Sequence, residues 1–164
     1  MNKISFGIGV LFITSIIACN GGDKKQEIQV IPANHDKKPK TLVDSLLKYI
    51  DDGHLTGMSK MSSLHKAKKE VQAVFDSIGK LPAGAQQKAA KFRASLNAVI
   101  KDIENADAGM EIWMPEYFEN TDTLADNVSE RIKYLNTEKI KVDKIKDAIL
   151  TSLQKADSLL KAKF

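Results

Sequence analysis

The chain has 164 residues, of which 43% are hydrophobic and only 6% aromatic, and its 25 lysines and arginines stand against 21 acidic residues for a net charge of +4. This small positive excess is interspersed along the chain, which argues against a nucleic-acid-binding protein. The length suits one domain. Because aromatic residues are scarce, its core must consist mainly of aliphatic side chains.

The N-terminal 18 residues resemble the signal peptide of a bacterial lipoprotein. Lys3 precedes an apolar stretch, residues 4–18, which is shorter than the ~20 apolar residues of a membrane-spanning helix. The stretch ends in Ile-Ile-Ala directly before Cys19, the only cysteine. This arrangement resembles a lipobox, whose cysteine becomes the lipid-modified first residue of the mature protein. A membrane anchor with an incidental cysteine is the alternative.

We therefore expect residues 1–18 to be removed and Cys19 to carry lipid, palmitate included. Such a lipoprotein belongs to the cell envelope, and we expect it on the periplasmic face of the outer membrane. More than one acyl chain gives stable attachment, since each buried methylene contributes ~0.8 kcal/mol. Residues 19–40 have no hydrophobic periodicity and contain two glycines and two prolines. They are predicted to form the lipid anchor and a flexible tether with a span of roughly 25 Å.

Residues 41–164 form the predicted helical domain, and its first helix should cover 41–78. Thr41 and Asp44 have the spacing of an N-terminal cap, and Gly79 is a typical stop. A break at Gly53 or Gly57 is an alternative, since each glycine costs ~1 kcal/mol in a helix interior. The predicted buried seam, at spacings of three and four, is Leu47, Ile50, His54, Gly57, Met61, Leu64, Lys68, Val71, Phe75 and Ile78. A lysine in this seam indicates either a snorkelling side chain or an error in its phase.

Two further helices are predicted over 84–114 and 123–162. Pro115 disfavours helical geometry at the residue before it, so the second helix should end at Met114. Thr123 and Asp126 have the spacing of a cap for the third helix. The second seam is Phe92, Leu96, Val99, Ile103, Ala106, Met110 and Trp113, and the third is Leu124, Val128, Leu135, Val142, Ile145, Ile149, Ala156 and Leu159.

These elements predict an all-α fold, an elongated antiparallel three-helix bundle with coiled-coil-like packing. Short connections favour antiparallel neighbours, and the seams have the three-and-four spacing of helices packed against helices. No strand pattern competes. A homo-oligomer, in which a second copy completes the seam, is the alternative to a bundle closed within one chain.

Three segments of the helical region resemble one known family. They are residues 58–69, 109–114 and 134–139, and the first two are similar to that family's His-Asp-Glu-Val-Met-Pro-Lys-Met and Met-Met-x-Trp-Met stretches. The family comprises small helical lipoproteins of Bacteroidota labelled "viral A-type inclusion protein". After His54 this chain has Leu55 and Thr56 in place of the family's two acidic residues. The family has no established activity, so the resemblance implies location and shape only.

The sequence offers no recognisable enzymatic motif. It has no glycine-rich phosphate loop, no paired cysteine ligands and no Glu-x-x-His motif of a di-iron bundle. We therefore predict no enzymatic activity and no cofactor, and an interaction or structural role with an unidentified protein partner. An uncharacterised envelope enzyme is an alternative.

One cluster suggests a second alternative, a Cu(I)- or Ag(I)-binding module. His54 and Met58 lie one helical turn apart, and a hairpin turning near residue 81 would bring Met110 to both of them and Met114 within about one turn. Thioether and imidazole ligands select soft ions such as Cu(I), and Trp113 would add a cation–π face. The commoner explanation is core packing, since methionine fills irregular gaps, and a partner-binding surface is a third possibility.

Overall fold

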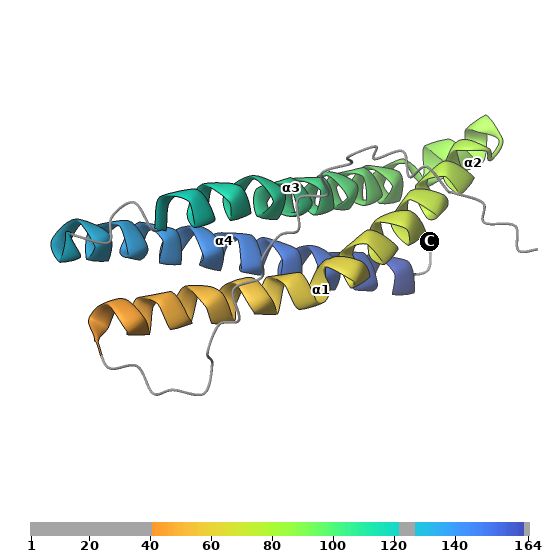
Figure 1. The fold of residues 1–164 in the computed structure, drawn as a ribbon. Coiled ribbons are helices and arrows are strands. Elements are labelled where there is room, and N and C mark those ends of the chain that lie inside the picture. Colours follow the sequence, from red (N-terminus) through yellow and green to blue (C-terminus); the bar gives the residue numbers. More distant parts are fainter. Residues whose placement is uncertain (1–40, 122–126, 163–164) are drawn as a thin grey trace, which may run out of the picture. The chain divides into compact units, whose positions relative to one another are not determined.

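The computed structural model describes residues 41–121 and 127–162. These residues form four helices, α1 (Leu42–Gly79), α2 (Ala83–Lys88), α3 (Ala90–Thr121) and α4 (Val128–Lys161), with no strand among them (Figure 1). The predicted all-α fold is confirmed. None of the helices in the described ranges is both long and apolar enough to cross a membrane. The predicted signal peptide, Cys19 and the tether lie outside the described residues.

The three long helices pack against one another as an antiparallel bundle (Figure 1). Gly57 of α1 meets Met110 of α3, and farther along α1 His65 meets Asp107, so α3 runs opposite to α1. On its other side α1 packs against α4. Gly53 approaches Val142 and Gly57 approaches Ile149, so these two helices run in the same direction. The up-down-up arrangement predicted from the short connections is therefore correct.

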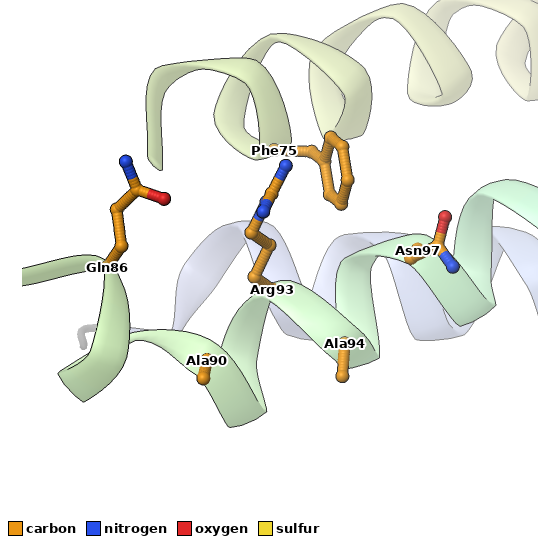
Figure 2. A pocket seen from close by; sticks show the side chains of 6 residues that line it. All are labelled: Phe75, Gln86, Ala90, Arg93, Ala94 and Asn97. Atoms are coloured by element: carbon orange, nitrogen blue, oxygen red, sulfur yellow. The ribbon is translucent and has the colours of Figure 1, made fainter. Parts of the chain in front are cut away.

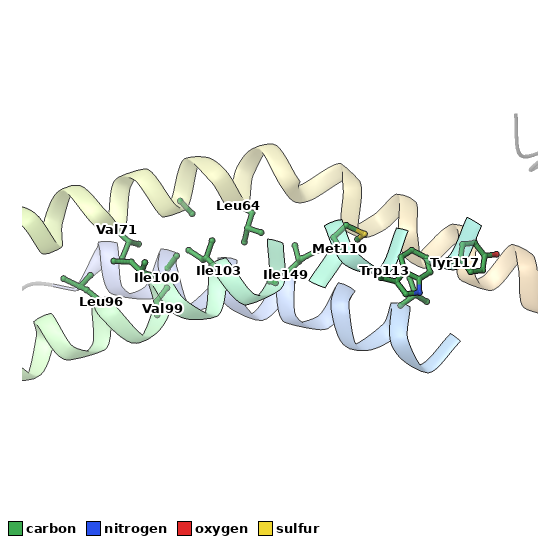
Figure 3. Packing of buried hydrophobic residues seen from close by; sticks show 14 of the residues in the cluster. Leu64, Val71, Leu96, Val99, Ile100, Ile103, Met110, Trp113, Tyr117 and Ile149 are labelled. Atoms are coloured by element: carbon green, nitrogen blue, oxygen red, sulfur yellow. The ribbon is translucent and has the colours of Figure 1, made fainter. Parts of the chain in front are cut away.

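Most seam residues recur at the three-and-four spacing of a heptad repeat. The fully or nearly buried apolar side chains run the length of the bundle (Figure 3). In α3 they include Leu96, Val99, Ile103, Ala106, Met110 and Trp113, as predicted, and in α4 they include Leu135, Val142, Ile149 and Ala156.

The predicted phase of α1 is wrong at every second position. At three of these positions the preceding residue is buried instead, namely Leu46, Gly53 and Ala67. The predicted seam residues that follow them, Leu47, His54 and Lys68, are half-buried at the edge of the interface. Small residues give no apolar signal, yet they allow the helices to approach closely. A Cβ at Gly53 would lie 3.3 Å from Val142 Cγ1. α1 continues unbroken through Gly53 and Gly57, because both glycines allow close packing against the neighbouring helices.

The cap at the start of α1 is confirmed, and that of α4 differs. Thr41 Oγ1 accepts from the Asp44 N–H and Asp44 Oδ2 accepts from the Thr41 N–H, both at 3.0 Å. The predicted Thr123–Asp126 cap lies outside the described residues. α4 begins at Val128, where Asn127 Oδ1 accepts from the Glu130 N–H at 3.1 Å. Val128 was predicted in the seam, but it is 61% exposed.

The predicted second helix, 84–114, differs from the structure at both ends. Its start is a separate short helix, α2, and α3 begins only at Ala90. Its end is not at Met114, because α3 continues through Pro115 to Thr121. Pro115 and Glu111 are both exposed, so water reaches the carbonyl that the proline ring leaves without a donor. Burial of Tyr117 beyond the proline secures the last turns.

Candidate functional site

An aromatic cluster fills one end of the bundle. Trp113 and Tyr117 both belong to α3, and their rings stack on each other with centroids 4.9 Å apart. Figure 3 shows them following Met110 along this helix. The imidazole of His54 lies 5.7 Å from the Trp113 ring and 6.1 Å from the ring of Phe118. Burial is the main cause that raises the pKa of Tyr117. His54 and Trp113 lie close together, as the hairpin arrangement predicts.

Glu138 of α4 is the buried carboxylate of this cluster. Trp113 Nε1–H donates to its Oε2 at 2.7 Å, and Lys141 Nζ lies 2.9 Å from its Oε1. The hydrogen bond to Glu138 is the main cause that raises the pKa of Lys141. Sequence reasoning missed this residue, although a signal existed. Glu138 lies three residues after Leu135 and four before Val142, which is a seam position.

His54 lies at the edge of the cluster, half-buried between α1 and α3. Its Nε2 atom is shielded from solvent and has no hydrogen-bond partner in the part of the chain that the structure describes. Burial without such a partner disfavours the charged imidazolium, and it lowers the pKa of His54 below its usual value of 6.5. The folded protein therefore presents a neutral imidazole with an unused nitrogen at neutral pH.

This lowered pKa predicts a loss of stability in mild acid. Above pH 6.5, His54 is neutral in both the folded and the unfolded chain. As the pH falls below that value, the unfolded chain binds the proton more readily, so stability declines until the pH has passed the lowered pKa of the folded state. Urea unfolding at several pH values between about 7.5 and 5 should show this decline reduced in His54→Gln. Equal slopes in wild type and His54→Gln would contradict the assignment.

The predicted methionine ligands are divided between core and edge. Met110 is only 1% exposed, and its Cε occupies the space over Gly57, where a Cβ would come within 2.6 Å. Met58 is 40% exposed on α1, and Met114 is half-buried on α3. Met110 is thus a packing residue, whereas Met58 and Met114 lie at the surface edge between α1 and α3.

Apart from the aromatic cluster, a pocket lies where α1, α2 and α3 meet. This open pocket of about 340 Å³ is lined by Phe75, Gln86, Ala90, Arg93, Ala94 and Asn97 (Figure 2). Arg93 of α3 reaches over the Phe75 ring at 4.4 Å from its centroid, while Gln86 Nε2 donates to the carbonyls of Gly79 and Leu81 at 3.0 and 2.7 Å. These two polar side chains therefore stabilise the α1–α2 turn and the α1–α3 contact.

Two basic side chains of α1 pair with acidic side chains of α3. Lys68 is outside the seam and pairs with Glu104 of α3 at 2.9 Å, and His65 Nε2 lies 2.9 Å from Asp107 Oδ1. Within the described ranges, no group of three or more His, Cys, Asp or Glu side chains could hold a metal ion. A metal at the α1–α3 edge would need thioether ligands.

The fold and this cluster define an all-α helical-bundle protein with an aromatic end. No protein-family profile, curated protein or solved structure matches the chain. The resemblance to the Bacteroidota lipoproteins therefore stays a prediction, and the cluster has to be interpreted from its own chemistry.

Proposed function

We propose that the protein is a lipid-anchored helical bundle of the cell envelope with a non-catalytic interaction or structural role. In this proposal, residues 1–18 are the signal peptide, Cys19 carries the lipid and residues up to 40 are the tether. The bundle from residue 41 onward is the part that meets a protein partner. The attachment places it on the periplasmic face of the outer membrane.

The observation that supports a non-catalytic role is the state of Glu138. It is the one carboxylate among the described residues that is fully removed from water. A catalytic acid or base needs a free oxygen within reach of a substrate, but Trp113 and Lys141 already occupy one oxygen each. Glu138 thus holds α3 to α4 from a buried position, which supports a role for the surface of the bundle rather than for a reactive interior.

The membrane attachment is tested by changing Cys19. We expect the wild-type protein to incorporate labelled palmitate and to fractionate with the outer membrane, and we expect Cys19→Ala to lose the label, because the lipid is attached through the thiol. Labelling followed by immunoprecipitation measures this directly. A variant that is labelled as strongly as the wild type would show that the lipid lies elsewhere or that the segment is an ordinary anchor.

The interaction role is tested by photo-crosslinking in intact cells. A photoreactive amino acid is placed at Ile112 or Ile140, which are 63% and 57% exposed, and, as a control, at the exposed Lys101. We expect an adduct of defined mass from one or both apolar positions but not from Lys101. The adduct should be reduced in the Cys19→Ala background, since the tether brings the bundle to its partner. Crosslinking that is absent or equal at all three positions would contradict a specific partner.

A further inference from the structure

The edge between α1 and α3 has a regular pairing of side chains. Three contacts mark it, namely His54 with Phe118 at 6.1 Å, His65 with Asp107 at 2.9 Å and Lys68 with Glu104 at 2.9 Å. From the first pair to the second, α1 advances eleven residues and α3 goes back eleven, and from the second to the third each moves three. The pairing therefore keeps one antiparallel register along the edge from His54 to Lys68.

This register places Met58 opposite Met114. Met58 lies four residues after His54, and Met114 lies four residues before Phe118, so both are one turn from the His54–Phe118 contact in the same direction. Residues four apart share one face of a helix. Two thioethers and the imidazole of His54 thus come to one short stretch of the edge, with Trp113 beside the imidazole. Met110 belongs to the core layer beneath, against Gly57.

The unused nitrogen of His54 is the second observation at this place. Buried polar atoms are almost always hydrogen-bonded, yet Nε2 of His54 has no partner among the described residues. A neutral imidazole nitrogen is a common metal ligand. Met58 is 40% exposed, so an ion would reach Nε2, which is itself shielded from solvent, along the Met58 side chain.

The chemistry of these donors selects the ion. Thioether sulfur is a soft ligand that favours Cu(I), and imidazole binds copper as well, whereas carboxylate and carbonyl oxygens suit Mg²⁺ and Ca²⁺. The face of an indole attracts a cation within about 6 Å of its centre, and the buried Trp113 ring lies 5.7 Å from the imidazole of His54. We propose that His54 Nε2, Met58 and Met114 form a binding site for a soft monovalent ion, Cu(I) or Ag(I). This inference is independent of the proposed interaction role, because it is tested on the purified protein.

The test is an anaerobic titration of the purified full chain in detergent. Cu(I) is added as its complex with a chelator that competes with the protein for the ion. A Cys19→Ala background removes the free thiol of any chain that has escaped lipidation, which would itself bind Cu(I). The fluorescence of Trp113, the only tryptophan, reports on the site. We expect a change that saturates at one ion per chain. Met58→Leu and Met114→Leu should each weaken binding by more than about tenfold, the least that loss of even an outer-shell partner typically costs a metal site. His54→Gln should do the same.

Two matched controls separate this site from other methionine chemistry. Met61 lies three residues beyond Met58 on α1, and Met110 lies in the core. The variants Met61→Leu and Met110→Leu should both keep the wild-type affinity. All four leucine substitutions nearly conserve volume, and helical circular dichroism of each variant verifies its fold. No saturable fluorescence change, or equal binding by the Met58→Leu/Met114→Leu double variant, would overturn the proposal. A folded Met110→Leu variant that loses binding would overturn this choice of ligands.

Discussion

Replacing Ile149 by aspartate should unfold the bundle. Ile149 is completely buried, and its Cδ1 lies 3.4 Å from the position of a Cβ on Gly57, so it packs where α4 meets α1. The substitution removes a large apolar side chain from the core and places a charge there without a partner. We expect a loss of more than about 4 kcal/mol, which is a large fraction of the stability of a domain of this size.

The matched control for this prediction is Ile140→Asp. It is the same chemical change on the same helix, but Ile140 is 57% exposed, so it should cost within about 0.5 kcal/mol. Circular dichroism at 222 nm during urea unfolding measures both variants. A folded Ile149→Asp protein with a midpoint near that of Ile140→Asp would show that α4 does not supply the core in solution.

The second large effect is expected at Glu138. In Glu138→Leu, the indole N–H of Trp113 loses its acceptor inside the bundle, and a buried donor without a partner costs about 1–3 kcal/mol. Lys141 is half-exposed and can turn to water, so its lost ion pair should add little. Urea unfolding followed by circular dichroism should therefore show a lower midpoint with an unchanged slope.

A double-mutant cycle isolates this hydrogen bond. Trp113→Phe removes the donor, so Glu138→Leu should cost less in that background than in the wild type, with a coupling energy of about 0.5–3 kcal/mol. The cycle also serves as the control for lost packing, because the volume changes are the same in both backgrounds. If the two substitutions are additive, the Trp113–Glu138 bond does not contribute to stability.

The helices themselves could be predicted from the sequence because their apolar side chains repeat at a constant spacing. The repeat was less informative about which neighbouring position is buried. Around Gly53 and Ala67, a seam extended at a constant spacing falls on the residue that follows, His54 or Lys68, because a small side chain gives little apolar signal. At Gly53 the interface accepts the small residue, since a Cβ there would already lie 3.3 Å from Val142 Cγ1 of α4. Glu138 was missed for a related reason, because a charged residue in a seam is stable only with partners that the sequence does not display.

The candidate site was predicted in its residue types but not in its register. A hairpin turning near residue 81 places residue 108 opposite His54. In the structure, His54 contacts Trp113 and Phe118 instead, because α2 (Ala83–Lys88) lies between the two long helices and moves the centre of the turn. This shift brings Met110, which was a seam residue in the prediction as well, against Gly57 instead of against His54. The local pattern could not reveal it, since a six-residue helix and a loop of the same length differ little in sequence.

An odd number of long helices has a mechanical consequence. Since α1 and α4 run in the same direction, Thr41 and Ala162 lie at opposite ends of the bundle. A pull between these residues loads the helices along their axes, so the interface must slide as a whole rather than open one turn at a time. α4 has 34 residues, which corresponds to about 50 Å of helix. Under the proposed lipid attachment at Cys19, the bundle would act as a rigid strut of about that length at the end of the tether.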